Sequence, residues 1–176
     1  SRRRHTRYIS VTGVQTCALP IFHAGELKAD NHVGAFRRPL PLQDCAVQLD
    51  FRLEGARVFH VGFDPAPGEL KKQGHLFSLI ITPAGWSLTE QPNKADAASK
   101  AVVHAKATTP FARGQWYTLL LEVKGDTVVA HIDGKPELRA TAKDFHVKKP
   151  GLVFRVGGVA PTDEVLVDNV KVWALE

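Results

Sequence analysis

Apolar and polar residues alternate in short runs along most of this chain from residue 44 onward. Residues 47–53 carry an apolar side chain at every odd position and a polar one at every even position, and Glu54-Gly55 ends the run. A period of two places one side of a β-strand in a core and the other side away from it. The pattern therefore predicts a half-buried strand at 47–53.

Further runs of this kind follow at regular spacing, separated by turn residues. Gly125-Asp126 and Asp133-Gly134 are typical of tight hairpin turns. The predicted strands cover 58–63, 76–82, 86–89, 102–103, 116–123, 127–133, a short stretch near 138, 152–156 and 165–173. Eight to ten strands, with neither an amphipathic helix nor a βαβ alternation, predict an all-β fold, an antiparallel β-sandwich. The side chains expected in its core are Leu49, Phe51, Phe59, Val61, Leu119, Leu121, Val128 and Ile132.

Length and composition limit the functional classes. The chain has 176 residues, 44% of them apolar and 23% charged, which is typical of one soluble globular domain. No run approaches the roughly 20 consecutive apolar residues of a membrane helix. The sequence also contains no phosphate loop, dinucleotide fingerprint, nucleophile elbow or zinc-spaced Cys/His set.

The basic charge of the chain is concentrated at one end. The net charge is +5, but Arg2, Arg3, Arg4 and Arg7 all lie in residues 1–21, where no acid occurs. The rest of the chain has 19 basic residues against 18 acidic ones, a net charge of +1. A domain this close to neutrality lacks the basic surface of nucleic-acid-binding proteins, so we expect no nucleic-acid partner.

Residues 1–21 also have an unusual sequence. The run 11–21 matches, residue for residue, the in-frame translation of a common sequencing-library adapter, and the reading phase continues into Phe22. We therefore expect residues 1–21 to be a non-native, unstructured segment and residues 22–176 to be one β-sandwich domain that lacks its native first strand. Without Cys17, Cys45 has no disulfide partner and is expected to be a small buried hydrophobe.

Four segments in order resemble a known family. They are 114–119 (GQWYTL), 122–126 (EVKGD), 132–135 (IDGK) and 167–173 (VDNVKVW). Together they resemble the second half of concanavalin A-like jelly rolls, in particular the bacterial 3-keto-disaccharide hydrolase domain family and its laminin-G-like relatives. Residues 25–32 and 37–42 are similar to the early strands of such domains.

The resemblance carries expectations about function. Members of this family are typically exported proteins linked to carbohydrate, and some act on 3-keto-glycosides. It implies a periplasmic or extracellular protein with a carbohydrate partner and a sugar held on a concave sheet. Whether this chain is an enzyme stays open.

Alternation along the strands collects ionisable residues on the side facing away from the core. The candidate catalytic residues are Glu122, His131 and His60, because acid–base catalysis needs groups that change protonation near neutral pH. The candidate substrate-binding residues are Asp50, Arg52, Trp86, Arg155 and Asp168. A solvated outer sheet face accounts for the same residue types without any ligand.

Sugar stacking by tryptophan and calcium binding by aspartates are two further candidate roles, and each of them has a simpler structural explanation. Trp86 and Trp116 are candidate stacking platforms for a sugar ring, with packing as the alternative. Calcium prefers oxygen ligands, and Asp126, Asp133, Asp163 and Asp168 supply them. Turn chemistry accounts for Asp126 and Asp133 equally well, so no metal site is assigned and no cofactor is expected, with calcium kept as a possibility.

Two functions follow. The first is a carbohydrate-associated jelly-roll domain that binds or hydrolyses glycosides or 3-keto-glycosides. The second is a structural or adhesion module of an exported protein, with no catalytic site. Clustering of His60, Glu122 and His131 around a groove favours the first function, and their dispersal favours the second.

Overall fold

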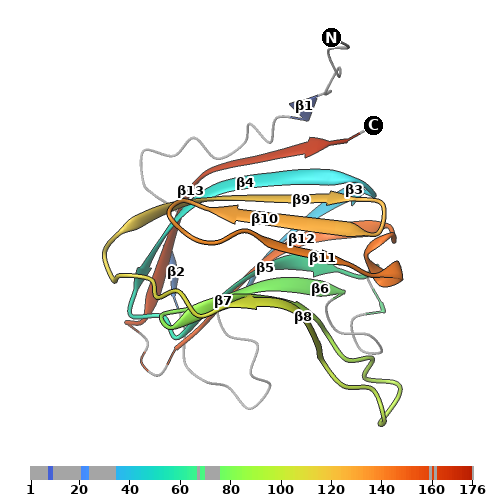
Figure 1. Cartoon of the computed structure of the whole chain (residues 1–176), viewed down its shortest axis with the longest axis horizontal. Helices are drawn as coiled ribbons and strands as arrows, with labels where there is room; N and C mark the ends of the chain where they lie inside the picture. The colour runs from blue at the N-terminus through green and yellow to red at the C-terminus, as the bar shows by residue number, and fades with distance from the viewer. Residues whose placement is uncertain are drawn as a thin grey trace.

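The computed structural model of the chain describes residues 8–9, 21–23, 35–66, 68–69, 76–158, 160 and 162–175. These residues form two antiparallel β-sheets packed face to face, which Figure 1 shows as an upper and a lower layer. The all-β antiparallel sandwich predicted from the alternation is confirmed.

The first sheet has the strand order β1-β13-β4-β9-β10-β11 in the described part of the chain, and β2 also pairs with β13. Its strands are β1 (Tyr8–Ile9), β2 (Ile21–His23), β4 (Cys45–Glu54), β9 (Trp116–Lys124), β10 (Thr127–Ile132), β11 (Leu138–Thr141) and β13 (Glu164–Ala174). Gly125 and Gly134 have positive φ angles of 58° and 68° in the turns that end β9 and β10. Both hairpin turns therefore form where the sequence predicts them.

The second sheet has the order β3-β12-β5-β6-β7-β8. Its strands are β3 (Ala35–Leu42), β5 (Val58–Asp64), β6 (Phe77–Thr82), β7 (Gly85–Glu90), β8 (Val102–Ala107) and β12 (Lys149–Gly157). β8 is longer than the pair of valines that predicted it. A 3₁₀ turn, η1 (Lys143–Phe145), precedes β12 and buries Phe145.

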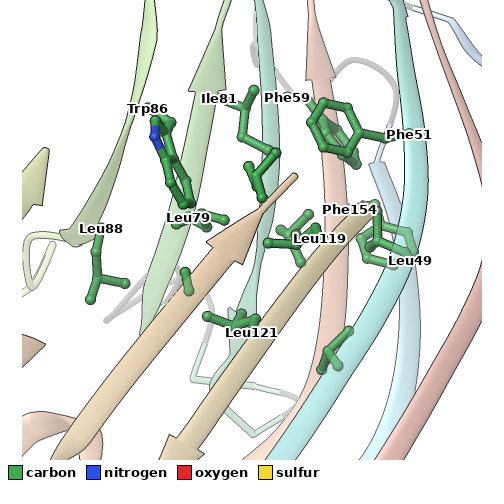
Figure 2. Close-up of a cluster of buried hydrophobic side chains, with 14 of the residues drawn as sticks. Leu49, Phe51, Phe59, Leu79, Ile81, Trp86, Leu88, Leu119, Leu121 and Phe154 are labelled. Carbon is green, nitrogen blue, oxygen red and sulfur yellow. The ribbon is translucent and has the colours of Figure 1, made fainter. Parts of the chain in front are cut away.

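The core lies between the sheets and consists of the apolar side of each strand (Figure 2). All eight predicted core residues are buried, with no more than 3% of any of them exposed. The Phe51 ring lies 5.7 Å from Phe59 on the opposite sheet and 5.6 Å from Tyr117, between ring centroids. The predicted alternation therefore has the correct register, since an error of one residue would have exposed these side chains.

The first residue of β12, Lys149, is a buried lysine. The Lys149 side chain has no exposed surface, and its Nζ donates hydrogen bonds to the carbonyl oxygens of Gln43 and Val147. Cys45 is free and buried, as expected. Burial lowers the pKa of Lys149 and raises the pKa of Cys45 to about 12.

Two short strands near the N-terminus contradict part of the expectation for residues 1–21. Tyr8 pairs with Trp173 and Ile21 pairs with Leu166, both antiparallel to β13. The expectation of an unstructured segment is therefore wrong for residues 8, 9 and 21, because backbone groups can complete a strand edge without any side-chain periodicity. The rest of residues 1–20 lies outside the described residues, and the adapter origin stays a prediction.

Within the described residues, no helix has the length and apolar character needed to cross a membrane.

Candidate functional site

The outer face of the first sheet carries the polar positions of β4. Leu49, Phe51 and Leu53 are buried in the core, so Asp50 and Arg52 lie on the opposite face. Asp50 pairs with Asp168 on β13 and with Thr118 on β9. The sheet therefore brings together two predicted site residues that are 118 positions apart in sequence.

Hydrogen bonds join these residues into one cluster. Thr118 Oγ1 donates to Asp50 Oδ1 at 2.9 Å, and Asn169 Nδ2 donates to Asp50 Oδ2 at 2.6 Å. The backbone N–H of Asn169 donates to Asp168 Oδ1 at 2.7 Å. Both carboxylates are thus held in place by neutral donors.

The position of Asn169 depends on an irregularity in β13. The pairing of β13 with β4 shifts register between Asp168 and Lys171, and Asn169 has a φ of 50°. A bulge of this kind redirects a side chain, and asparagine tolerates the left-handed conformation better than most residues. The bulge turns the Asn169 amide toward Asp50.

An aromatic side chain borders the cluster on β9. Trp116 pairs with Arg52 and is 37% exposed. The Arg52 guanidinium lies 5.3 Å from the centroid of the Trp116 ring, a cation–π distance. Arg52 Nε lies 2.7 Å from Glu54 Oε1 without hydrogen-bond geometry, so this contact is an ion pair only.

Asp50, Trp116, Asp168 and Asn169 line a depression of about 330 Å³ on this face. Its walls combine one aromatic surface, two carboxylates and one amide. An aromatic surface suits the apolar C–H side of a sugar ring, and carboxylates accept hydrogen bonds from hydroxyl groups. The depression is therefore chemically suited to a polyhydroxylated ligand.

Two of the predicted catalytic residues lie on the same face but away from the depression. Glu122 follows Trp116 by six residues on β9, which corresponds to about 20 Å along a strand. His131 pairs with Leu120, and His131 Nε2 lies 3.5 Å from Glu137 Oε2. Glu122 and His131 are diagonal neighbours on the sheet, but neither lines the depression.

The other ionisable candidates lie on the opposite side of the molecule, which corrects the predicted common face. His60 on β5 pairs with Arg155 on β12, and both strands belong to the second sheet. Their neighbours Phe59, Val61 and Phe154 are buried in the core, so His60 and Arg155 lie on the outer face of that sheet. Alternation separates core from surface correctly, but it does not tell which of two sheets a strand joins.

Trp86 was also named as a candidate sugar-binding residue, and the structure places it in the core instead. It is 3% exposed and packs between the sheets, among the core side chains in Figure 2. A ring buried to this extent cannot stack on a sugar. The alternative of core packing is correct for Trp86, and the exposed tryptophan of the pair is Trp116.

The four aspartates considered for calcium do not gather at one place. Asp126 accepts a hydrogen bond from Thr127 beside the β9–β10 turn, and Asp163 accepts one from the N–H of Ala160. Asp133 lies in the turn after β10, and Asp168 lies in the depression. The described part of the chain contains no group of three or more His, Cys, Asp or Glu residues arranged to hold a metal ion.

Thr118 and Asn169 were not predicted as site residues. Thr118 is one of many threonines on polar strand faces, so nothing in the sequence marks it. For Asn169 a signal existed, because the Asp168-Asn169 pair lies in the middle of a predicted strand, where both residue types are depleted.

No family model matches the chain, and no curated protein matches it either. Solved structures do. The carbohydrate-binding module CBM66 from Bacillus subtilis is 15% identical, with a TM-score of 0.54 over 79% of this chain and 78% of the module. Chicken galectin 2 is 12% identical, with a TM-score of 0.56 over 78% of this chain and 97% of the galectin.

An enzyme has a similar fold as well. SCLam, a non-specific endo-β-1,3(4)-glucanase from family GH16, is 16% identical, with a TM-score of 0.58 over 89% of this chain and 71% of the glucanase. Identities this low show a shared fold alone. The chain therefore has a concanavalin A-like jelly-roll architecture, as the sequence resemblance implied.

Proposed function

We propose that this chain is a carbohydrate-binding domain and that the depression lined by Asp50, Trp116, Asp168 and Asn169 holds the sugar. The observation that carries the proposal is the convergence of an exposed aromatic ring and two fixed carboxylates on neighbouring strands. A solvated outer face would supply similar residue types, but without a depression that they line in common. The similarity to a carbohydrate-binding module and a galectin supports the proposal at the level of the fold.

The geometry assigns a role to each side chain. Trp116 presents its ring to the apolar face of a pyranose, and Arg52 stacked on Trp116 limits the orientations of the indole. Asp50 and Asp168 accept hydrogen bonds from sugar hydroxyls. Thr118 and Asn169 hold Asp50 in one orientation, so little side-chain freedom is lost when the sugar binds.

We propose binding in preference to hydrolysis. A general acid or base must come within about 2.6–3.2 Å of the proton that it transfers. Glu122 and His131 lie outside the depression, and His60 lies on the other sheet. Hydrolysis of 3-keto-glycosides, the activity that the sequence resemblance implies for some family members, would need a different site.

The second candidate function is a structural or adhesion module. It is favoured by the dispersal of His60, Glu122 and His131 over two outer faces. A structural module and a binding domain differ in one measurable property, because only the second loses an activity when Trp116 is removed. Export from the cell, which the family resemblance implies, is proposed for either function.

Affinity electrophoresis against soluble β-glucans, mannans, galactans and fructans tests the proposal. We expect the wild-type chain to be retarded by at least one of these polymers and Trp116→Ala to lose at least tenfold in affinity for it. Phe36→Ala is the matched control, since Phe36 is an aromatic residue of the second sheet that is 41% exposed. Equal retardation of the wild type and Trp116→Ala would overturn the proposal, and so would the absence of any retardation.

A further inference from the structure

We infer that the depression selects its sugar by charge: it accepts rings with free hydroxyls or an ammonium group and rejects rings that carry a carboxylate or a sulfate. The inference rests on the proposed function, since it names the class of sugar held at the same depression. It follows from the hydrogen-bonding and charge inventory of the depression and its rim.

The depression is rich in acceptors. Each oxygen of an ionised carboxylate has two acceptor positions. Asp50 uses one position on Oδ1 for Thr118 and one on Oδ2 for Asn169. Asp168 uses one position on Oδ1 for the backbone of Asn169, and among the described residues nothing donates to Asp168 Oδ2. Five of the eight acceptor positions on the two carboxylates therefore remain for a ligand.

Few donors remain at the same place. The hydroxyl hydrogen of Thr118 already points to Asp50, and one hydrogen of the Asn169 amide does the same. The Asn169 backbone N–H is used by Asp168. Two donors on the lining residues are left, the second hydrogen of the Asn169 amide and the Trp116 indole N–H. The free acceptor positions outnumber them, so a hydroxyl or an ammonium group finds more partners here than a group that can only accept hydrogen bonds.

The nearby cations form no ion pair with the two aspartates among the described residues. Arg52 Nε lies 2.7 Å from Glu54 Oε1, and Arg113 Nε lies 3.7 Å from Glu54 Oε2, so both arginines are directed to Glu54. Lys171 lies beyond the bulge, opposite Gln48, and the described residues show no ion pair between Lys171 and either aspartate. The walls of the depression therefore present two negative charges to a ligand.

Charge and hydrogen bonding favour the same ligands. A carboxylate or sulfate would place a third negative charge beside Asp50 and Asp168, where like charges repel. An ammonium group gains both a favourable charge interaction and donors. The selectivity is expected to weaken as salt rises, because the depression is open to solvent and added ions screen exposed charges.

Methyl glycosides test this selectivity on the full chain. The probes are a neutral methyl glycoside, its 2-amino-2-deoxy analogue and its uronic acid analogue in the gluco, galacto and manno series. Binding is followed by NMR through the Trp116 indole N–H and the Asn169 side-chain amide, at low salt and at 0.5 M salt. We expect the uronides to bind at least tenfold more weakly than the neutral glycosides and the amines at least threefold more tightly.

Asp168→Asn is the diagnostic variant, because it removes one charge and keeps an oxygen acceptor for the Asn169 backbone. We expect it to bring the three affinities closer together, with the ratio of neutral glycoside to uronide affinity falling at least threefold. Uronides that bind as well as the neutral glycosides would overturn the inference and leave carbohydrate binding intact. If no probe in any series shifts either signal, the depression is not a sugar site, and the proposed function fails together with the inference.

Discussion

Asp50 and Asp168 lie directly opposite each other on β4 and β13, and Asn169 donates a hydrogen bond to each of their carboxylates. Like charges placed opposite each other on neighbouring strands destabilise a sheet. The asparagine reduces this cost without cancelling either charge, since an amide is neutral. The arrangement therefore keeps two ionised acceptors at the surface at some expense in stability, which is common at binding sites.

Asp168→Asn is predicted to stabilise the fold. The amide oxygen can still accept the hydrogen bond of the Asn169 backbone, while the repulsion with Asp50 is lost. We expect the free energy of unfolding in urea to rise by about 0.2–1 kcal/mol at low salt, with the gain disappearing near 1 M salt.

Asp96→Asn is the control for the change in net charge. Asp96 is exposed and accepts a hydrogen bond from the N–H of Ala98 in a loop away from the depression. A gain in Asp168→Asn no larger than that in Asp96→Asn, or a gain that is insensitive to salt, would contradict the repulsion between Asp50 and Asp168.

The left-handed conformation of Asn169 gives a second prediction. Alanine at this position loses the hydrogen bond to Asp50 and also meets the steric cost of a positive φ, roughly 1–2 kcal/mol. Glycine loses the same hydrogen bond without the steric cost. We expect urea unfolding to rank the variants as wild type, then Asn169→Gly, then Asn169→Ala in decreasing stability. Equal stability of the two variants would show that the bulge relaxes when Asn169 is replaced.

Alternation predicts which side chains enter the core because it depends only on the pleat of each strand. Leu49, Phe59 and Leu119 were placed correctly for that reason. Sheet membership depends instead on where the chain crosses between the layers. The chain crosses between β4 and β5, at residues 55–57, so Asp50 and His60 share a polar pattern but lie on opposite sides of the molecule.

The residues of the site were predicted only in part, because alternation does not show where a strand is irregular. Asp50 and Asp168 were named from the pattern, and the structure pairs them. Asn169 enters the site through a register shift in β13, and the period of two carries no information about a bulge. The alternation of β9 already puts Trp116 on the outer side with Thr118 and Glu122. The predicted run at 86–89 is too short to show by its period on which side the Trp86 ring lies.

Trp86 gives a third prediction, on stability without an effect on binding. Its Nε1 is buried and has no hydrogen-bond partner among the described residues. Trp86→Phe removes that unsatisfied donor, a gain of about 1–3 kcal/mol, which offsets much of the packing that the smaller ring loses. Trp86→Ala leaves a cavity and is expected to cost about 3–5 kcal/mol.

Urea unfolding and affinity electrophoresis measure the two effects of the Trp86 substitutions separately. Trp86→Phe should unfold within about 1 kcal/mol of the wild type and bind sugar as the wild type does. Loss of sugar binding by a folded Trp86→Phe variant would place Trp86 in the site and overturn its assignment to the core.

Cys45 gives the last prediction, on stability at alkaline pH. Burial, the largest cause, raises the pKa of the thiol from 9.0 to about 12, while Lys149 acts in the opposite direction and Asp44 adds to the rise. Between these two values the unfolded chain has lost the thiol proton and the folded chain retains it. The contribution of the neutral Cys45 thiol to the free energy of unfolding is therefore fully present below pH 9. It is lost as the pH rises toward 12, by at most about 1.4 kcal/mol per pH unit.

Lys149 changes stability in the opposite direction at high pH. Its pKa is lowered below 10.5 in the folded chain, so the unfolded chain holds more protons just below 10.5 and stability rises with pH there. The contribution of Cys45 is isolated by subtracting the unfolding free energy of Cys45→Ala from that of the wild type at each pH. This difference should be constant up to about pH 8 and should fall steadily from pH 9 to 10.5. With Cys17 replaced by serine, so that Cys45 is the one thiol of the chain, the native protein should also resist a thiol-specific reagent at pH 8 and react once urea unfolds it. A flat difference, or a reactive thiol in native Cys17→Ser, would show that Cys45 is not buried as a neutral group.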